Sequence, residues 1–189
     1  MEPVYFFSGR RAQRVAVFCY LLALEAGLSR EDADLLRLVA PARNASKGYA
    51  PDGASGSSTC ASWTDCVKGL DIMKNSGDDI MKAAGIVARQ YHEHWNGCGY
   101  PNGLRAEEIH IFARIAGLAN VFDALTHWRL YPEPFGPADV AALIRRQRGR
   151  RFDPRLVDIF LHNLDEFFKI RNRYPEAGNL HTRNDAGRL

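Results

Sequence analysis

Residues 91–104 hold the side chains of this sequence that are best suited to chemistry. His92, Glu93 and His94 follow one another there, and imidazole and carboxylate groups are ligands that transition metals accept. Side chains two positions apart on a helix point about 200° apart, so His92 and His94 are not expected to bind one ion together. We therefore expect His92 in the core, His94 at the surface, and no metal site made by this pair.

A glycine-rich turn follows the histidines. Gly99 and Gly103 permit positive φ angles and Pro101 presets a turn, so the segment is first of all a turn. Tyr100 offers an aromatic face and a hydroxyl group, which suit stacking on a nucleobase or anchoring a protein interface. A purely structural turn and a recognition surface made by Gly99, Tyr100 and Pro101 both stay open here.

These residues resemble the signature of the HD-GYP family, in which two histidines and a glutamate precede a Gly-Tyr-Pro loop. Three further segments match the family in the same order along the chain: residues 43–52, 118–132 and 151–157. The resemblance implies an all-α fold, an HD-domain-like bundle of about five to seven helices. It also implies cyclic di-GMP phosphodiesterase activity supported by a cluster of iron or manganese ions.

The metal-binding positions of the family carry other residue types in this sequence, and His92 alone is kept of the set. One imidazole cannot hold a cluster of metals, and a guanidinium among the replacements would place a permanent positive charge where the cations bind. The replaced positions are Arg43, Asn44, Ser76, Tyr91 and Asn120, with Phe7 and Arg11 in place of an N-terminal Glu and His. The resemblance therefore predicts a degenerate domain with no metal, no other cofactor and no catalytic activity.

Basic residues around the same site could still bind phosphate. Lys47 and Arg129 stand where the family has ligand-binding residues, and a guanidinium suits bidentate contact with phosphate. Arg43 adds a third positive charge, but the Lys that follows in the family is Pro132 here, which weakens the inherited site. A retained structural or solvated role for Lys47, and surface salt bridges for Arg129, stay open.

The leading functional hypothesis is a non-catalytic signalling module that acts by protein–protein interaction in cyclic di-GMP signalling. The family resemblance implies a GGDEF-domain diguanylate cyclase as the candidate partner, bound through the Gly-Tyr-Pro loop. One alternative is a metal-free effector that binds cyclic di-GMP through Tyr100 and the three basic residues Arg43, Lys47 and Arg129. A second alternative is residual cyclic di-GMP phosphodiesterase activity.

Composition and charge favour an ordinary globular protein. The chain has 189 residues, 46% hydrophobic and 25% charged, which suffices for one core. The net charge of +3 gives no reason to expect a nucleic-acid polymer as a partner. Four cysteines without CxxC spacing fit a reducing compartment, and no apolar run approaches the ~18 residues needed to span a bilayer. We expect a cytoplasmic protein without membrane insertion, bacterial by its resemblance.

A basic run marks the region after residue 144, and it has two interpretations. It favours a solvated helix end, where positive charge complements the helix dipole, but it could also attract an acidic partner. DNA binding is not expected, because no DNA-reading motif accompanies it. The run consists of Arg145, Arg146, Arg148, Arg150, Arg151 and Arg155.

Helical periodicity runs through the chain, and no long alternating strand pattern occurs. Ser29 is expected to start the second helix and Pro41 to end it, while Asp153 is expected to cap a helix that begins at Pro154. Helices are predicted over residues 11–26, 29–40, 67–94, 106–126, 139–148 and 154–170. Core positions predicted for the third of these are Ile72, Ile80, Ala84 and Val87.

We expect a single domain over residues 1–173. Small residues make a flexible loop at 53–66, and the polar residues 174–189 are expected to form a disordered tail.

Overall fold

The computed structural model describes residues 10–41, 78–127 and 134–175. Within these ranges the chain forms seven α-helices and no strand, which confirms the all-α fold and the expected number of helices. The region 42–77, which includes Ile72 and the expected loop, lies outside the described residues, as does the tail from 176. None of the described helices has the length and apolar character needed to cross a membrane.

An N-terminal pair of helices forms as the sequence predicts. Helix α1 (Arg10–Glu25) ends before Gly27, whose φ of 85° turns the chain into α2 (Arg30–Val39). The Ser29 hydroxyl caps α2 by accepting the N–H of Asp32 at 3.0 Å. Helix α1 packs against α2 and also against α6, so the pair closes one side of the core.

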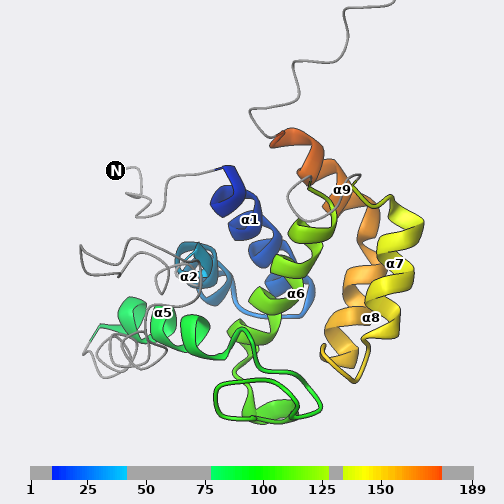
Figure 1. Ribbon diagram of the computed structural model, residues 1–189. Helices are drawn as coiled ribbons and strands as arrows, with labels where there is room; N and C mark the ends of the chain where they lie inside the picture. The colour runs from blue at the N-terminus through cyan, green and yellow to red at the C-terminus, as the bar shows by residue number, and fades with distance from the viewer. Residues whose placement is uncertain (1–9, 42–77, 128–133, 176–189) are drawn as a thin grey trace, which may run out of the picture.

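Helix α6 (Ile111–Leu125) is the central helix, as its apolar sequence indicates. It lies between α1 and the C-terminal helices in Figure 1. It starts later than predicted, because residues Ala106–Glu108 form a short 3-10 helix (η2) and His110 caps α6. The helix before it, α5 (Asp79–Gln90), packs on α2 and α6.

Helix α5 departs from the prediction in one core position and at its C-terminal end. Ala84 and Val87 are buried as expected, but Ile80 is 44% exposed, so its assignment to the core is wrong. Ile80 lies in the first turn of α5, and the buried side chains of this helix begin only at Ala83. The helix ends at Gln90, so residues 91–94 are not helical.

Three helices complete the bundle: α7 (Pro137–Arg146), α8 (Pro154–His162) and α9 (Leu164–Arg173). Asp153 caps α8 as predicted, accepting the N–H of Arg155 at 2.9 Å. The single helix predicted over 154–170 is wrong, because the chain turns at Asn163. The Asn163 amide donates to the Ile159 carbonyl at 3.0 Å, a local side-chain bond of the kind that competes with helix continuation.

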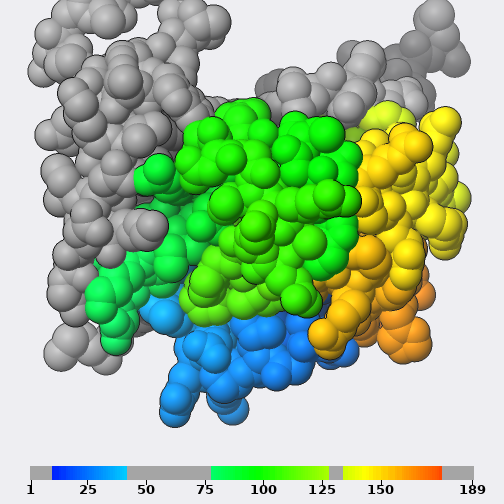
Figure 2. Space-filling view, turned by 90° about the horizontal axis from the view of Figure 1, so that it is seen from below, coloured from blue at the N-terminus to red at the C-terminus, as the bar shows by residue number. Residues whose placement is uncertain are grey.

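Aromatic side chains from four helices form the centre of the core. Phe122 on α6 meets Phe18 on α1 with ring centroids 4.9 Å apart and Phe160 on α8 at 5.3 Å. Phe167 on α9 lies 4.7 Å from Phe160. These offset and edge-to-face contacts stabilise a fixed packing of the helices. On the face shown in Figure 2, the segment that links α5 to α6 lies between the N-terminal and C-terminal helices.

Candidate functional site

The candidate site lies where α5 ends against α6. Tyr91 is the C-cap of α5, and its carbonyl oxygen would lie 3.2 Å from a Cβ placed on Gly117 of α6. A glycine at 117 therefore allows the two helices to approach closely. Asn120 lies one turn further along the same side of α6. The structure thus places Tyr91 against the side of α6 that carries Asn120, and these are two of the positions singled out from the sequence.

Arg11 reaches this junction from α1. Its Nη2 atom donates to Asn120 Oδ1 at 3.2 Å, and its Nε atom lies 3.0 Å from Asp123 Oδ2. The second contact is an ion pair without hydrogen-bond geometry, because Arg11 Nε has no hydrogen-bond partner in the described part of the chain. The Arg11 side chain is 35% exposed. A partly exposed guanidinium therefore lies beside Asn120, which the family resemblance aligns with a metal-binding aspartate.

Asp123 fixes this arrangement from inside the bundle. Its Oδ1 atom accepts from Nε of the fully buried Arg14 at 2.7 Å. His127 Nδ1 lies 2.9 Å from the Asp123 carbonyl oxygen. Burial lowers the pKa of His127, and the positive charges of Arg14 and Arg171 act in the same direction, while Asp123 opposes them. The cluster carries one carboxylate and three guanidinium groups, counting Arg11, so it is rich in positive charge.

Three rings form an aromatic stack beside this junction: Tyr91, His92 and Tyr100. His92 lies 3.9 Å from Tyr91 and 4.6 Å from Tyr100 between ring centroids, and the second pair is nearly parallel at 23°. Tyr100 is 49% exposed, so the outer end of the stack is open to solvent. His92 and His94 are both half-buried, which corrects the expected division into one core and one surface histidine.

Glu93, which the sequence analysis left without a role, anchors the Gly-Tyr-Pro loop. It is 7% exposed, and its carboxylate accepts the N–H groups of Asn102 at 2.7 Å and Leu104 at 3.1 Å. A Cβ on Gly99 would lie 2.5 Å from Glu93 Cα, so only glycine fits there. The contacts with Glu93 therefore hold the loop in one conformation, with Tyr100 and Pro101 on its outer side.

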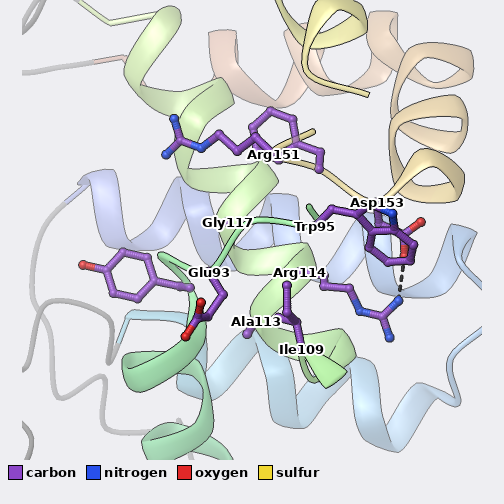
Figure 3. Close-up of a pocket in the computed structure, with 10 residues that line it drawn as sticks. Glu93, Trp95, Ile109, Ala113, Arg114, Gly117, Arg151 and Asp153 are labelled. Atoms are coloured by element: carbon purple, nitrogen blue, oxygen red, sulfur yellow. Dashed lines mark hydrogen bonds and ion pairs between the residues drawn. The ribbon is translucent and has the colours of Figure 1, made fainter. Parts of the chain in front are cut away.

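A small cavity of ≈ 10 Å³ lies behind this loop, between Glu93, Trp95, Arg114 and Arg151 (Figure 3). Its volume is about that of a single water molecule, so it cannot enclose a nucleotide. Arg114 lines the cavity, and its guanidinium donates to the Asp153 carboxylate at 2.7 Å. This hydrogen bond links α6 to the start of α8.

The metal ions implied by the family do not fit the residues described at this junction. Asn120 offers a neutral amide oxygen that already accepts from Arg11, and the Arg11 guanidinium brings a permanent positive charge next to it. Within residues 10–41, 78–127 and 134–175, no three His, Cys, Asp or Glu side chains are grouped to hold an ion. The remaining expected site residues lie outside the described ranges, and their roles stay predictions: Arg43, Asn44, Lys47, Ser76 and Arg129.

Comparison with known proteins identifies the class. Residues 72–156 match a family described as "HD domain". The 3'3'-cGAMP-specific phosphodiesterase 2 of Vibrio cholerae serotype O1 is 35% identical over 176 residues, which are 89% of this chain and 34% of that protein. The cyclic di-GMP phosphodiesterase response regulator RpfG of Xanthomonas campestris pv. campestris is 31% identical over 172 residues, 87% of this chain and 46% of that protein. Residues 72–156 therefore match the HD domain family, and the resemblance of the chain to the HD-GYP family is confirmed.

A solved structure agrees with this fold. The crystal structure of a cyclic GMP-AMP specific phosphodiesterase of V. cholerae (V-cGAP3) superimposes with a TM-score of 0.63 and 21% identity. The match covers 88% of this chain and 46% of that one, and at this identity it shows the fold alone. The chain spans about a third to a half of the length of these relatives.

The expectation that this chain is not an enzyme is corrected by these relatives. Proteins similar over most of the chain are named phosphodiesterases, which points to an enzyme. The expectation of inactivity rests on the metal-binding positions that carry other residue types. Three of these positions, Arg43, Asn44 and Ser76, lie outside the described residues. Loss of activity therefore does not follow from it.

Proposed function

We propose that this HD domain binds a cyclic dinucleotide on the surface where α1, α5 and α6 meet. The observation that carries the proposal is the Arg11 guanidinium, which contacts Asn120 and Asp123 on α6, the helix against which the Tyr91 end of the aromatic stack lies. The names of the relatives supply the ligand class, and hydrolysis of the bound ligand is the activity they suggest. The proposal includes the cytoplasmic location expected from the sequence.

The chemistry of the two groups matches that ligand. A cyclic dinucleotide presents phosphodiesters, for which a guanidinium is a good partner, and purine bases, which stack on aromatic rings. Arg11 and Tyr100 are both partly exposed, so a ligand can reach them without opening the core. The buried Arg14 adds positive charge below Arg11, which favours an anion on the outside.

A calorimetric titration of cyclic di-GMP, and separately of 3'3'-cGAMP, into the full chain tests this proposal. Arg11→Ala should weaken binding about tenfold, equivalent to about 1.4 kcal/mol, by removing a charged contact to phosphate. Arg10→Ala is the matched control, because Arg10 is exposed and its guanidinium donates to the Pro175 carbonyl instead. Absence of binding to the wild-type chain at near-millimolar ligand would reject the proposal. Hydrolysis is followed on the same samples by chromatography.

A second candidate function is supported by the Gly-Tyr-Pro loop itself: docking of a protein partner, with a GGDEF-domain diguanylate cyclase as the candidate. Tyr100 is a large side chain, 49% exposed, on a loop held rigid by Glu93, and such anchors suit protein interfaces. Tyr100→Ala should abolish capture of the cyclase, whereas Cys98→Ala, at an exposed position of the same loop, should not. Unchanged capture by Tyr100→Ala would reject this role.

A further inference from the structure

Arg151 lies in the turn between α7 and α8, and this turn is fixed to the Gly-Tyr-Pro loop. The Trp95 N–H donates to the Arg151 carbonyl at 3.1 Å, and the Asn96 N–H donates to the Arg150 carbonyl at 2.9 Å. Both bonds use backbone atoms, so they hold the turn in place whatever side chains it carries. The Arg151 side chain is consequently held at a constant place relative to the loop that bears Tyr100.

In the part of the chain that the structure describes, Arg151 has no carboxylate partner. The two carboxylates that line the neighbouring cavity are both occupied. Asp153 accepts from Arg114 at 2.7 Å, and Glu93 accepts two N–H groups of the loop. Figure 3 shows the Arg151 guanidinium directed away from the Arg114–Asp153 pair. Of the six arginines of the basic run, Arg151 is the one that is half-buried, and the others are exposed.

The surroundings of Arg151 reduce its contact with water without neutralising it. The side chain is half-buried, and its guanidinium carbon lies 5.6 Å from the centre of the Phe152 ring. Burial lowers the pKa of Arg151, while the nearby Tyr100 acts in the opposite direction. The pKa of His94 is lowered by burial and then by the charge of Arg151, so His94 is neutral beside it near pH 7. A partly desolvated cation without a counter-ion is costly, and an anion at this place relieves that cost.

We infer that Arg151 is a second phosphate-binding residue of the site, and that it holds a phosphodiester of the ligand whose base stacks on Tyr100. This inference rests on the proposed function, and it adds a contact from the α7–α8 turn to those from α1 and α5. One cation and one partly exposed aromatic ring, on segments joined by backbone hydrogen bonds, fit the combination of charge and base found in a nucleotide.

A pair of neighbouring substitutions tests the inference by titration of cyclic di-GMP and 3'3'-cGAMP into the full chain. Arg151→Gln and the matched control Arg150→Gln each remove one charge, and both leave the backbone bonds to Trp95 and Asn96 in place. Arg150 is exposed, so its loss should change affinity less than about twofold. Arg151→Gln should weaken binding about tenfold and should alone reduce the dependence of affinity on salt.

Thermal unfolding of each variant separates binding from folding, and Arg151→Lys, which keeps the charge, should bind more tightly than Arg151→Gln. Equal affinity of Arg151→Gln and the wild-type chain would overturn the inference and leave the proposed function standing. Equal losses in Arg150→Gln and Arg151→Gln would also overturn it, because they would reflect net charge alone. A wild-type chain that binds neither cyclic dinucleotide would reject both the inference and the proposed function.

Discussion

Arg14 on α1 and Asp123 on α6 form a buried ion pair, with 2.7 Å between Nε and Oδ1 and side chains that are 0% and 2% exposed. The pair joins the two helices that bear the proposed phosphate site. The other oxygen of Asp123 lies 3.0 Å from Arg11 Nε, so the same carboxylate positions the partly exposed Arg11 side chain. The location of Arg11 beside Asn120 therefore depends on a contact inside the core.

Asp123→Ala should destabilise the chain by about 3–5 kcal/mol, because it leaves the Arg14 charge buried and unpaired. The free energy of unfolding, measured with urea, gives this difference. Asp158→Ala is the matched control: it also removes a carboxylate paired with an arginine, Arg148 at 2.7 Å, but this pair is exposed. Solvent screens it, so only a small change is expected. Similar losses in both variants would contradict the structural role of Asp123.

Gly99→Ala should lower stability by about 1–3 kcal/mol, since its Cβ would overlap the backbone of Glu93 and His94. Gly136→Ala provides the comparison, because a Cβ at Gly136 meets no atom within 4 Å and its φ is −76°. The melting temperatures of the Gly99→Ala and Gly136→Ala variants test this prediction. A Gly99→Ala variant as stable as Gly136→Ala would show that the loop does not need the close approach seen here.

Glu93→Ala should loosen the Gly-Tyr-Pro loop, because the N–H groups of Asn102 and Leu104 lose their acceptor. The expected loss is about 1–3 kcal/mol of stability. Hydrogen exchange at these two amides should accelerate, whereas Glu93→Gln, which keeps one oxygen acceptor, should show a smaller effect. Unchanged exchange in Glu93→Ala would mean that the carboxylate does not hold the loop.

The free energy of unfolding should fall as the pH drops below about 6.5. The pKa of His127 is lowered from 6.5 in the folded chain, mainly by burial. The unfolded chain therefore binds more protons in this window, which favours unfolding. His127→Gln should make the dependence shallower, with His94 and His110, whose pKa values burial also lowers, supplying the rest. His162→Gln, at an exposed position, should leave it as in the wild-type chain. Equal pH slopes for the wild-type chain and His127→Gln would contradict this account.

Local sequence signals predicted much of the fold. Caps such as Ser29 and Asp153 act over a few residues, so they place the starts of α2 and α8 without knowledge of the rest. Periodicity alone does not reveal the turn at Asn163, because the apolar pattern continues on both sides of it. The helix is interrupted there by a hydrogen bond from the Asn163 side-chain amide to the Ile159 carbonyl. Periodicity places Ile80 in the core, because it does not show at which residue a helix begins to pack against the rest of the protein.

The candidate site was predicted in part. The family motifs single out Tyr91 and Asn120, which meet at the end of α5, and the resemblance also points to Tyr100, which is 49% exposed. The contacts of Arg11 and Arg151 could not be predicted, because they join segments far apart in the chain. Comparison with the family motif considers each position separately. It therefore does not indicate that Arg11 and Asn120, two positions aligned with metal ligands of the family, contact each other.

The most direct test of the central claim is to map where a cyclic dinucleotide binds. Cyclic di-GMP is titrated into the isotope-labelled full chain and the amide shifts are followed by NMR. The account predicts saturable shifts confined to Arg11, His92, Tyr100, Asn120 and Arg151, with the Phe18–Phe122 core unaffected. Saturable shifts on a different face, or none at near-millimolar ligand, would contradict it.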